Sequence, residues 1–216
     1  SVINNANCKT YYKLFDKYYS FDLEDCRNYG FSFLNTWYTF SKIENNTNPK
    51  YDYGALMTFC KEKIQSYIKI KKSLPKELSG KEYLIFKPKS SFFYRKIINH
   101  KLYKEIDKKN VYYKFLPLEK ATAFYNDCKA VIDVPLSGQN GLTVRTFETL
   151  YQQKKLITTN AYIKNYNFYT PTNIFVVDDQ HTEIPISFFD TPFDKKYSIG
   201  EEYSLKSFVH KLFDLR

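Results

Sequence analysis

The fold of this chain is decided by the stretch Asp133-Val-Pro-Leu-Ser-Gly-Gln-Asn-Gly-Leu-Thr-Val-Arg-Thr-Phe-Glu-Thr-Leu-Tyr-Gln-Gln-Lys-Lys-Leu-Ile-Thr-Thr-Asn160. Its pattern predicts a strand that ends at Asp133, a polar loop with two glycines, an amphipathic helix and a second strand. Gly138 and Gly141 would let the backbone come close to a ligand. The free amides and the positive dipole end of the helix favour an anion there. The stretch therefore predicts an anion site at the loop.

The helix that follows the loop places Arg145 and Glu148 three residues apart, and so on one face. Arginine binds phosphate with two parallel hydrogen bonds, which lysine cannot do. The chain is poor in this residue type, because only four of its 33 basic residues are arginines, namely Arg27, Arg95, Arg145 and Arg216. A ligand with phosphate and sugar groups is the simplest interpretation of the pair.

The remaining chain alternates apolar strands with amphipathic helices. We expect strands over 17–21, 31–39, 51–59, 83–86, 111–116, 130–134, 156–159 and 173–178 and helices over 22–29, 61–73, 92–103, 118–127 and 204–213, although the small residues near 54–57 also allow a helical start. Strands separated by helices imply parallel βαβ units. The predicted fold class is α/β, a doubly wound, mostly parallel Rossmann-like sheet. Residues 1–40 would form a linking segment and 41–216 the nucleotide-sugar-binding domain, with a polar linker over 41–50.

Ligands of such sheets bind at the carboxyl ends of the strands, where the strand order reverses. The loops expected there are 58–63, 87–91, 115–119, 135–142 and 160–167. They carry groups suited to a nucleotide: Thr58, Lys61, Lys63, Lys87, Lys89, the backbone at Phe115 and Leu116, and the turn Gln139-Asn140-Gly141. For each lysine a solvated position is the simpler alternative, and Gln139 and Asn140 could serve only as turn formers.

The net charge of +10 raises nucleic acid or an anionic membrane as partners. The lysines are spread along the chain, however, as an A/T-rich coding bias would produce on solvated faces. The segment Phe92–Tyr103 mixes aromatic and basic residues, so it would suit a helix packed on the sheet edge or on another domain, or else an anionic bilayer surface.

Four scattered cysteines without a Cys-x-x-Cys motif favour reduced thiols and a cytoplasmic location. His100, His181 and His210 lack neighbours that would complete a triad or a metal site. No apolar run of eighteen residues predicts a membrane span, and the chain begins without a secretion signal. No metal and no cofactor are expected.

The run Gln139-Asn-Gly-Leu-Thr-Val-Arg-Thr-Phe-Glu148, after a strand that ends in aspartate, resembles the C-terminal nucleotide-sugar domain of GT-B glycosyltransferases. More closely, it is similar to bacterial proteins of lipopolysaccharide and capsule synthesis that carry Gln-x-Gly-Leu-Thr-x-Arg-x-x-Glu. Segments 19–33 and 168–174 are similar to the same group. The resemblance covers most of the chain.

This resemblance implies roles for individual residues. Glu148 would accept hydrogen bonds from the ribose hydroxyls of the donor. The amides of Gly141, Leu142 and Thr143 would approach the diphosphate with the help of Arg145, and Phe115 and Leu116 would border the base. Many retaining members carry a second glutamate eight residues before the first, where this chain has Asn140, which leaves the stereochemical outcome open.

The resemblance also implies an enzyme, a glycosyltransferase that transfers a sugar from a nucleotide-diphosphate donor to a lipopolysaccharide or capsular glycan. Its partners would be the donor, a glycan or glycolipid acceptor and the cytoplasmic face of the inner membrane, without nucleic acid. The chain would be the donor-binding part, because the N-terminal acceptor domain of such enzymes has no place before residue 17, and the catalytic residues are unknown. A non-catalytic α/β interaction domain and a basic nucleic-acid-binding domain are the alternatives.

Overall fold

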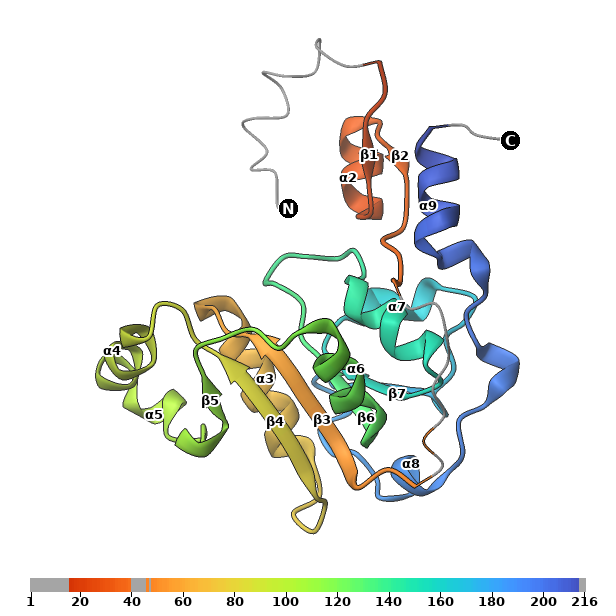
Figure 1. Ribbon diagram of the computed structural model, residues 1–216. Coiled ribbons are helices and arrows are strands. Elements are labelled where there is room, and N and C mark those ends of the chain that lie inside the picture. The colour runs from red at the N-terminus through yellow and green to blue at the C-terminus, as the bar shows by residue number, and fades with distance from the viewer. Residues whose placement is uncertain (1–15, 40–45, 47, 214–216) are drawn as a thin grey trace.

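The computed structural model describes residues 16–39, 46 and 48–213, so most of the predicted linker 41–50 and Arg216 lie outside the described residues. Its centre is a parallel sheet of six strands: β3 (Tyr51–Thr58), β4 (Gly80–Ile85), β5 (Val111–Tyr112), β6 (Cys128–Asp133), β7 (Lys155–Thr158) and β8 (Ile174–Val176). The strands lie in the order β5-β4-β3-β6-β7-β8, and every pair is parallel (Figure 1). The predicted Rossmann-like sheet is confirmed.

Strand order reverses between β3 and β6, because the chain winds outward from β3 to β5 and then restarts beside β3. Tyr53 pairs with Ala130 across this boundary. This is the strand order of dinucleotide-binding folds, in which the ligand crevice lies where the order reverses.

Helices cover both faces of the sheet, as a doubly wound fold requires. One core cluster joins α3 (Lys61–Ser73), α4 (Ser90–Ile98), α5 (His100–Tyr103) and α8 (Ser187–Asp190) to one face. Alternate strand residues face the other side, where Val131 packs under α6 (Leu118–Asn126) and Leu156 under α7 (Val144–Tyr151). The alternation places α3 behind the sheet and α6 in front of it (Figure 1).

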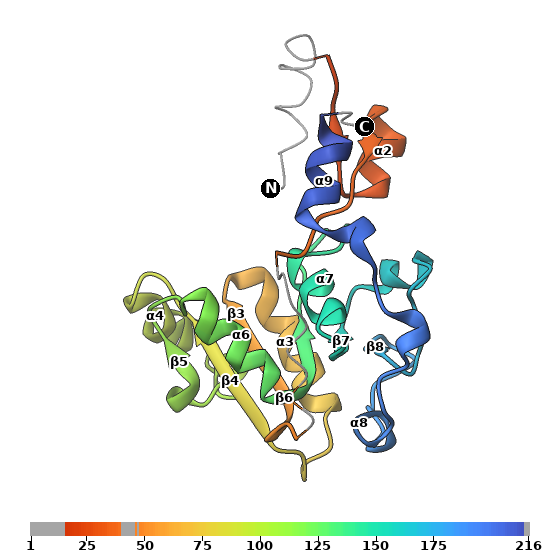
Figure 2. The same ribbon diagram turned by 45° about the vertical axis from the view of Figure 1, so that its right-hand side comes forward.

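The linking segment stands apart from the sheet. Its described part holds β1 (Tyr19–Ser20), α2 (Leu23–Tyr29) and β2 (Ser32–Phe33), with β1 parallel to β2. Asp22 and Gly30 cap α2 as predicted, Gly30 in the left-handed conformation with φ 71°. The C-terminal helix α9 (Leu205–Leu212) lies beside these elements in both views (Figures 1 and 2). Trp37 contacts Phe208 of α9, with ring centroids 4.2 Å apart.

Several predicted strands have different bounds, and of the strand predicted over 31–39 only Ser32–Phe33 forms β2. The predicted strand 111–116 is short, because β5 pairs only with Leu84 and Ile85 at the end of β4 and has no neighbour beyond Tyr112. The strand predicted over 83–86 begins earlier, at Gly80, where Lys81 pairs with Asp127 at 3.0 Å and Glu82 pairs with Lys71. These ion pairs allow polar residues to continue the strand.

Candidate functional site

Asp133 ends β6 beside the point where the strand order reverses, and it ties the strand to the following helix. Its Oδ2 accepts hydrogen bonds from the hydroxyls of Thr143, at 2.6 Å, and Thr146, at 2.8 Å. Thr143 also caps α7, since its hydroxyl accepts from the amide of Thr146. Burial raises the pKa of Asp133, and the two hydroxyl groups and the charge of Lys63 oppose that rise. The carboxylate therefore fixes the end of β6 to the start of α7.

Side-chain hydrogen bonds to backbone carbonyls hold the loop between Asp133 and α7 in place. Gln139 donates from Nε2 to the carbonyl of Gly141 at 3.1 Å, which is the turn-forming role left open by the sequence. Asn160, at the end of β7, donates from Nδ2 to the carbonyl of Asn140 at 3.1 Å. The side chain of Leu142 is buried in the core, so only its backbone borders the loop surface.

The loop amides predicted to receive a diphosphate already hold a carboxylate. Asp22 Oδ2 accepts from the amide of Asn140 at 3.1 Å and from that of Gly141 at 3.4 Å, while Oδ1 caps α2. Asn140 also donates from Nδ2 to Glu24. The backbone at Gly141 lies so close to Phe21 that a Cβ there would be 2.3 Å from its ring. The anion that these amides bind in the structure is thus the side chain of Asp22.

A cavity of about 500 Å³ lies between the loop and the linking segment. Aromatic rings and the carboxylates of Asp22, Glu24 and Asp25 line it, and its described lining includes neither lysine nor arginine. A cavity with this charge repels a diphosphate. The described lining of this cavity therefore offers no cation to an anionic donor.

Arg145 lies on the α6 side of the start of α7, over the ring of Tyr125, with its guanidinium carbon 5.4 Å from the ring centroid. The Tyr125 hydroxyl reaches the carbonyl of Leu56 in β3, at 3.5 Å. This contact puts Arg145 above the boundary between β3 and β6. Leu116 packs against the same cluster as Tyr125, so the loop after β5 borders this region.

One nitrogen of the Arg145 guanidinium lacks a hydrogen-bond partner among the described residues. Part of the side chain reaches the surface, but Nη1 is buried and has no hydrogen-bond partner within residues 16–39, 46 and 48–213. Burial lowers the pKa of Arg145 to about 10, against the opposing charge of Glu148, and the side chain stays cationic at neutral pH. A buried cation with an unused donor is a costly arrangement that a bound anion would relieve.

Glu148 lies one turn further along α7, and its Oε1 accepts from the hydroxyl of Thr39 at 3.0 Å. Burial raises the pKa of Glu148, while the Thr39 hydrogen bond and the charge of Arg145 oppose the rise. The linking segment runs along this helix, as Thr36 donates to the carbonyl of Leu142 and Tyr38 stacks on Tyr151. Glu148 thus already binds one hydroxyl group from the chain itself.

The other predicted site residues spread along the carboxyl edge. Thr58 and Lys61 are exposed at the junction of β3 and α3, and Lys63 acts on Asp133 through its charge. Lys87 lies 3.6 Å from the ring centroid of the exposed Phe115. Lys89 is exposed just before α4. The structure therefore brings Arg145, Glu148 and Leu116 to one region beside the boundary of β3 and β6. Of the lysines, Lys63 acts on this region through its charge on Asp133.

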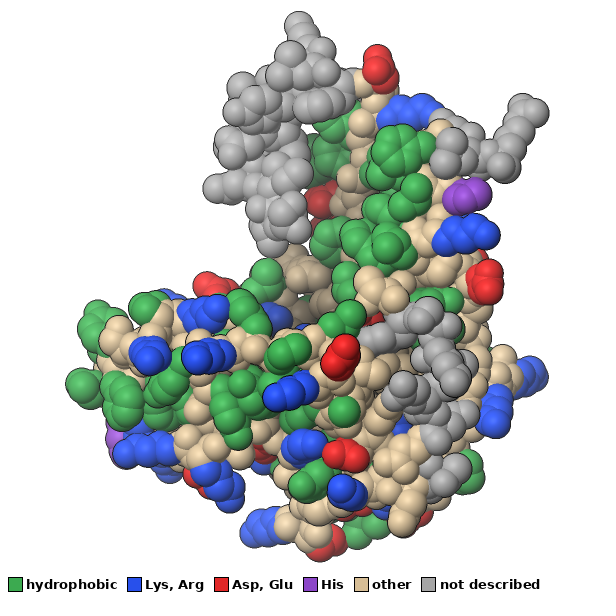
Figure 3. All heavy atoms as spheres, in the orientation of Figure 1, with side chains coloured by type: hydrophobic (Ala, Val, Ile, Leu, Met, Phe, Trp, Pro, Cys, Tyr) green, Lys and Arg blue, Asp and Glu red, His purple; other side chains and the backbone are tan. Residues whose placement is uncertain are grey.

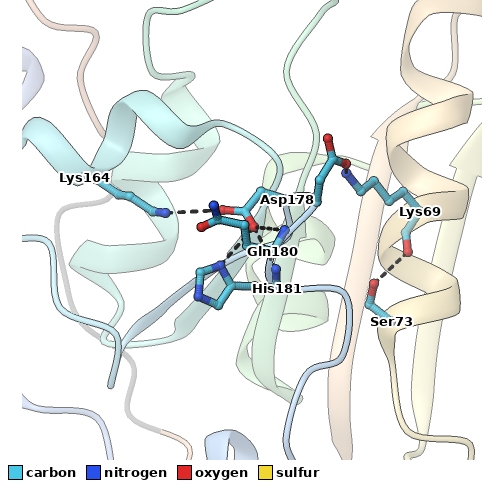
Figure 4. A network of polar contacts seen from close by, with 7 residues as sticks. Lys69, Ser73, Lys164, Asp178, Gln180 and His181 are labelled. Atoms are coloured by element: carbon cyan, nitrogen blue, oxygen red, sulfur yellow. Dashed lines mark hydrogen bonds and ion pairs between the residues drawn. The ribbon is translucent and has the colours of Figure 1, made fainter.

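A polar network lies just after β8, at the carboxyl edge of the sheet (Figure 4). Asp178 accepts from the ring of His181 at 2.9 Å, from the amides of Gln180 and His181, and from Lys164 at 3.3 Å. These hydrogen bonds hold the pKa of Asp178 well below its ordinary value. His181 closes this loop through its contacts with Asp178.

Sequence reasoning missed Asp22, Thr39, Thr146 and Asn160 as site residues. Asp22 was recognisable as a helix cap, but its second oxygen acts across 118 positions of sequence. The described residues hold no group of three or more His, Cys, Asp or Glu that could bind a metal ion. Within them, no helix has the length and apolar content needed to cross a membrane.

Comparison of the chain with protein-family models and with curated proteins finds no match.

Proposed function

We propose that this chain is the donor-binding part of a glycosyltransferase, which binds a nucleotide-diphosphate sugar at the boundary between β3 and β6. The observation that carries the proposal is the buried, unpartnered Nη1 of Arg145 at that boundary. The resemblance of residues 139–148 to nucleotide-sugar domains supports it.

In this proposal the diphosphate lies on the Arg145 side of α7, because the loop amides on the other side hold Asp22. Arg145 neutralises the leaving-group charge through bidentate hydrogen bonds. Glu148 exchanges the Thr39 hydroxyl for the ribose hydroxyls, which are chemically equivalent donors. Phe115 and Leu116 border the base. The glycan acceptor and the catalytic base come from outside this crevice.

Calorimetric titration of the full chain with UDP, GDP, CMP and the matching nucleosides tests the proposal. We expect saturable binding of at least one nucleoside diphosphate and at least about tenfold weaker binding of its nucleoside, since the lost phosphates carry the Arg145 contact. Absence of binding by every nucleotide, even at millimolar concentration, would refute it.

A second function is favoured by a separate observation, that Asp22 and Thr39 fill ligand positions from within the chain. In that case the protein is a non-catalytic interaction domain that keeps the sheet. The Asp22→Ala variant distinguishes the two, because an interaction domain fails to bind nucleotides even when the loop amides are released.

A further inference from the structure

Helix α4 carries apolar side chains on two sides, and only one side is covered in the described chain. Phe92 is buried against Phe86, with ring centroids 5.0 Å apart. The outward side exposes two pairs of residues four apart, each aligned on the helix surface. Their exposed fractions are 53% for Phe93, 82% for Ile97, 65% for Tyr94 and 64% for Ile98.

Basic residues surround this outward side. Residues 87–109 contain eight Lys and Arg against two Asp and Glu, a net charge of +6 within a chain of +10. The two acids are next to lysines, since Lys109 pairs with Asp107 at 3.1 Å and Lys104 lies 4.0 Å from Glu105. This segment therefore holds more than half of the net charge of the chain.

The apolar and basic groups share one surface. A groove of about 310 Å³ is lined by Phe93, Lys96, Ile97, His100 and Lys108, so basic and apolar side chains line it together. Figure 3 shows hydrophobic and basic side chains gathered together over the α4 end of the molecule. We call the exposed residues of α4 and α5 with Lys108 the α4–α5 surface.

The chemistry of this surface distinguishes between anionic partners. A nucleic acid would engage the cations but leave Ile97 and Ile98 in water, since it offers phosphates and stacking faces and no aliphatic phase. An anionic bilayer accepts both kinds of group, with apolar side chains at the acyl boundary and lysines against the headgroup phosphates.

We propose that the α4–α5 surface docks the chain on a bilayer that contains anionic phospholipids. Phe93, Tyr94, Ile97 and Ile98 enter the interface, and the lysines of α4 and α5 contact headgroup phosphates. Because α4 begins at Ser90, five residues after β4 ends at Ile85, docking holds the carboxyl edge of the sheet near the membrane plane. The docking surface is independent of the proposed nucleotide site.

Co-sedimentation of the full chain with vesicles tests the docking surface. We expect binding to mixed phosphatidylcholine and phosphatidylglycerol vesicles, at least about tenfold weaker binding to pure phosphatidylcholine, and weakening by added salt. The double variant Ile97→Ser/Ile98→Ser should lose at least about tenfold in affinity, because it removes the most exposed aliphatic groups. Lys101→Glu/Lys108→Glu should lose a similar factor.

The matched control is Ile186→Ser, an exposed isoleucine at α8 that should leave vesicle binding unchanged. Urea unfolding verifies that each variant keeps the wild-type stability. Equal binding to both vesicle types, or unchanged binding by Ile97→Ser/Ile98→Ser, would overturn the proposal. So would light scattering that shows a wild-type dimer converted by this variant to a monomer, or an oligonucleotide that binds where vesicles do not. Vesicle binding requires no nucleotide, so its failure is separate from failure of the proposed function.

Discussion

The two sides of the start of α7 differ in whether their hydrogen-bond donors already have partners. On the side of the linking segment, the amides of Asn140 and Gly141 donate to the carboxylate of Asp22. On the α6 side, Arg145 lies on Tyr125 and keeps a buried Nη1 without a partner in the described chain. The first side is a completed structural joint, and the second holds a cation with one unused hydrogen-bond donor. A glycine loop at a helix start therefore does not by itself identify a ligand site.

The largest effect on the free energy of unfolding is expected from Asp133, which binds the start of α7. Asp133→Ala removes the acceptor for Thr143 and Thr146, and we expect a loss of about 3 kcal/mol in the free energy of unfolding. Asp133→Asn keeps an acceptor oxygen and should lose less. Urea unfolding measures both variants, and equal losses would show that the hydroxyl contacts are unimportant.

A smaller effect is expected where the linking segment meets the loop. Gly141→Ala places a Cβ 2.3 Å from the ring and 2.5 Å from the carbonyl oxygen of Phe21, so it should cost about 2 kcal/mol and expose the linking segment to protease. Gly138→Ala is the matched control, because Gly138 has open space and only its φ of 77° opposes a side chain, at about 1 kcal/mol. If only Gly138→Ala increased cleavage, the joint described here would be wrong.

The smallest effect is a pH dependence on the Arg145 side. The pKa of Glu148 is raised by burial above its ordinary value of 4.5, so its protonated form favours the folded state. The resulting stability is fully present below pH 4.5 and is lost as the pH rises through the raised pKa. Glu148→Gln should therefore flatten the fall in the free energy of unfolding over this window.

Thr39→Val provides the matched test, because the Thr39 hydrogen bond lowers the pKa of Glu148. Its removal should steepen the same fall in stability. Urea unfolding at a series of pH values compares the three proteins. A Glu148→Gln profile parallel to that of the wild type would mean that Glu148 is effectively solvated.

Local signals in the sequence predict most of the sheet. The helix α3 matches its predicted bounds, and the caps of α2 at Asp22 and Gly30 are recognised from residue type alone. β5 is shorter than predicted because the length of an edge strand depends on its neighbour, β4, which ends at Ile85. Pairing partners are not encoded within a strand itself.

The site is predicted less completely than the fold. The sequence identifies the loop and the Arg145–Glu148 spacing, which are local to one helix. It does not reveal the contacts of Asp22 with Asn140 or of Thr39 with Glu148, which span 118 and 109 positions. These contacts decide which polar groups are already satisfied, and only the three-dimensional arrangement determines them.

The most direct test of the difference between the two sides is calorimetric titration of Arg145→Met and Asp22→Ala with the nucleoside diphosphate that wild type binds best. We predict that Arg145→Met keeps its stability, because it removes a guanidinium whose buried Nη1 has no hydrogen-bond partner in the described chain, yet loses at least about tenfold in affinity. Asp22→Ala should bind at least as tightly as wild type. Wild-type affinity in Arg145→Met, with lost binding in Asp22→Ala, would contradict this account.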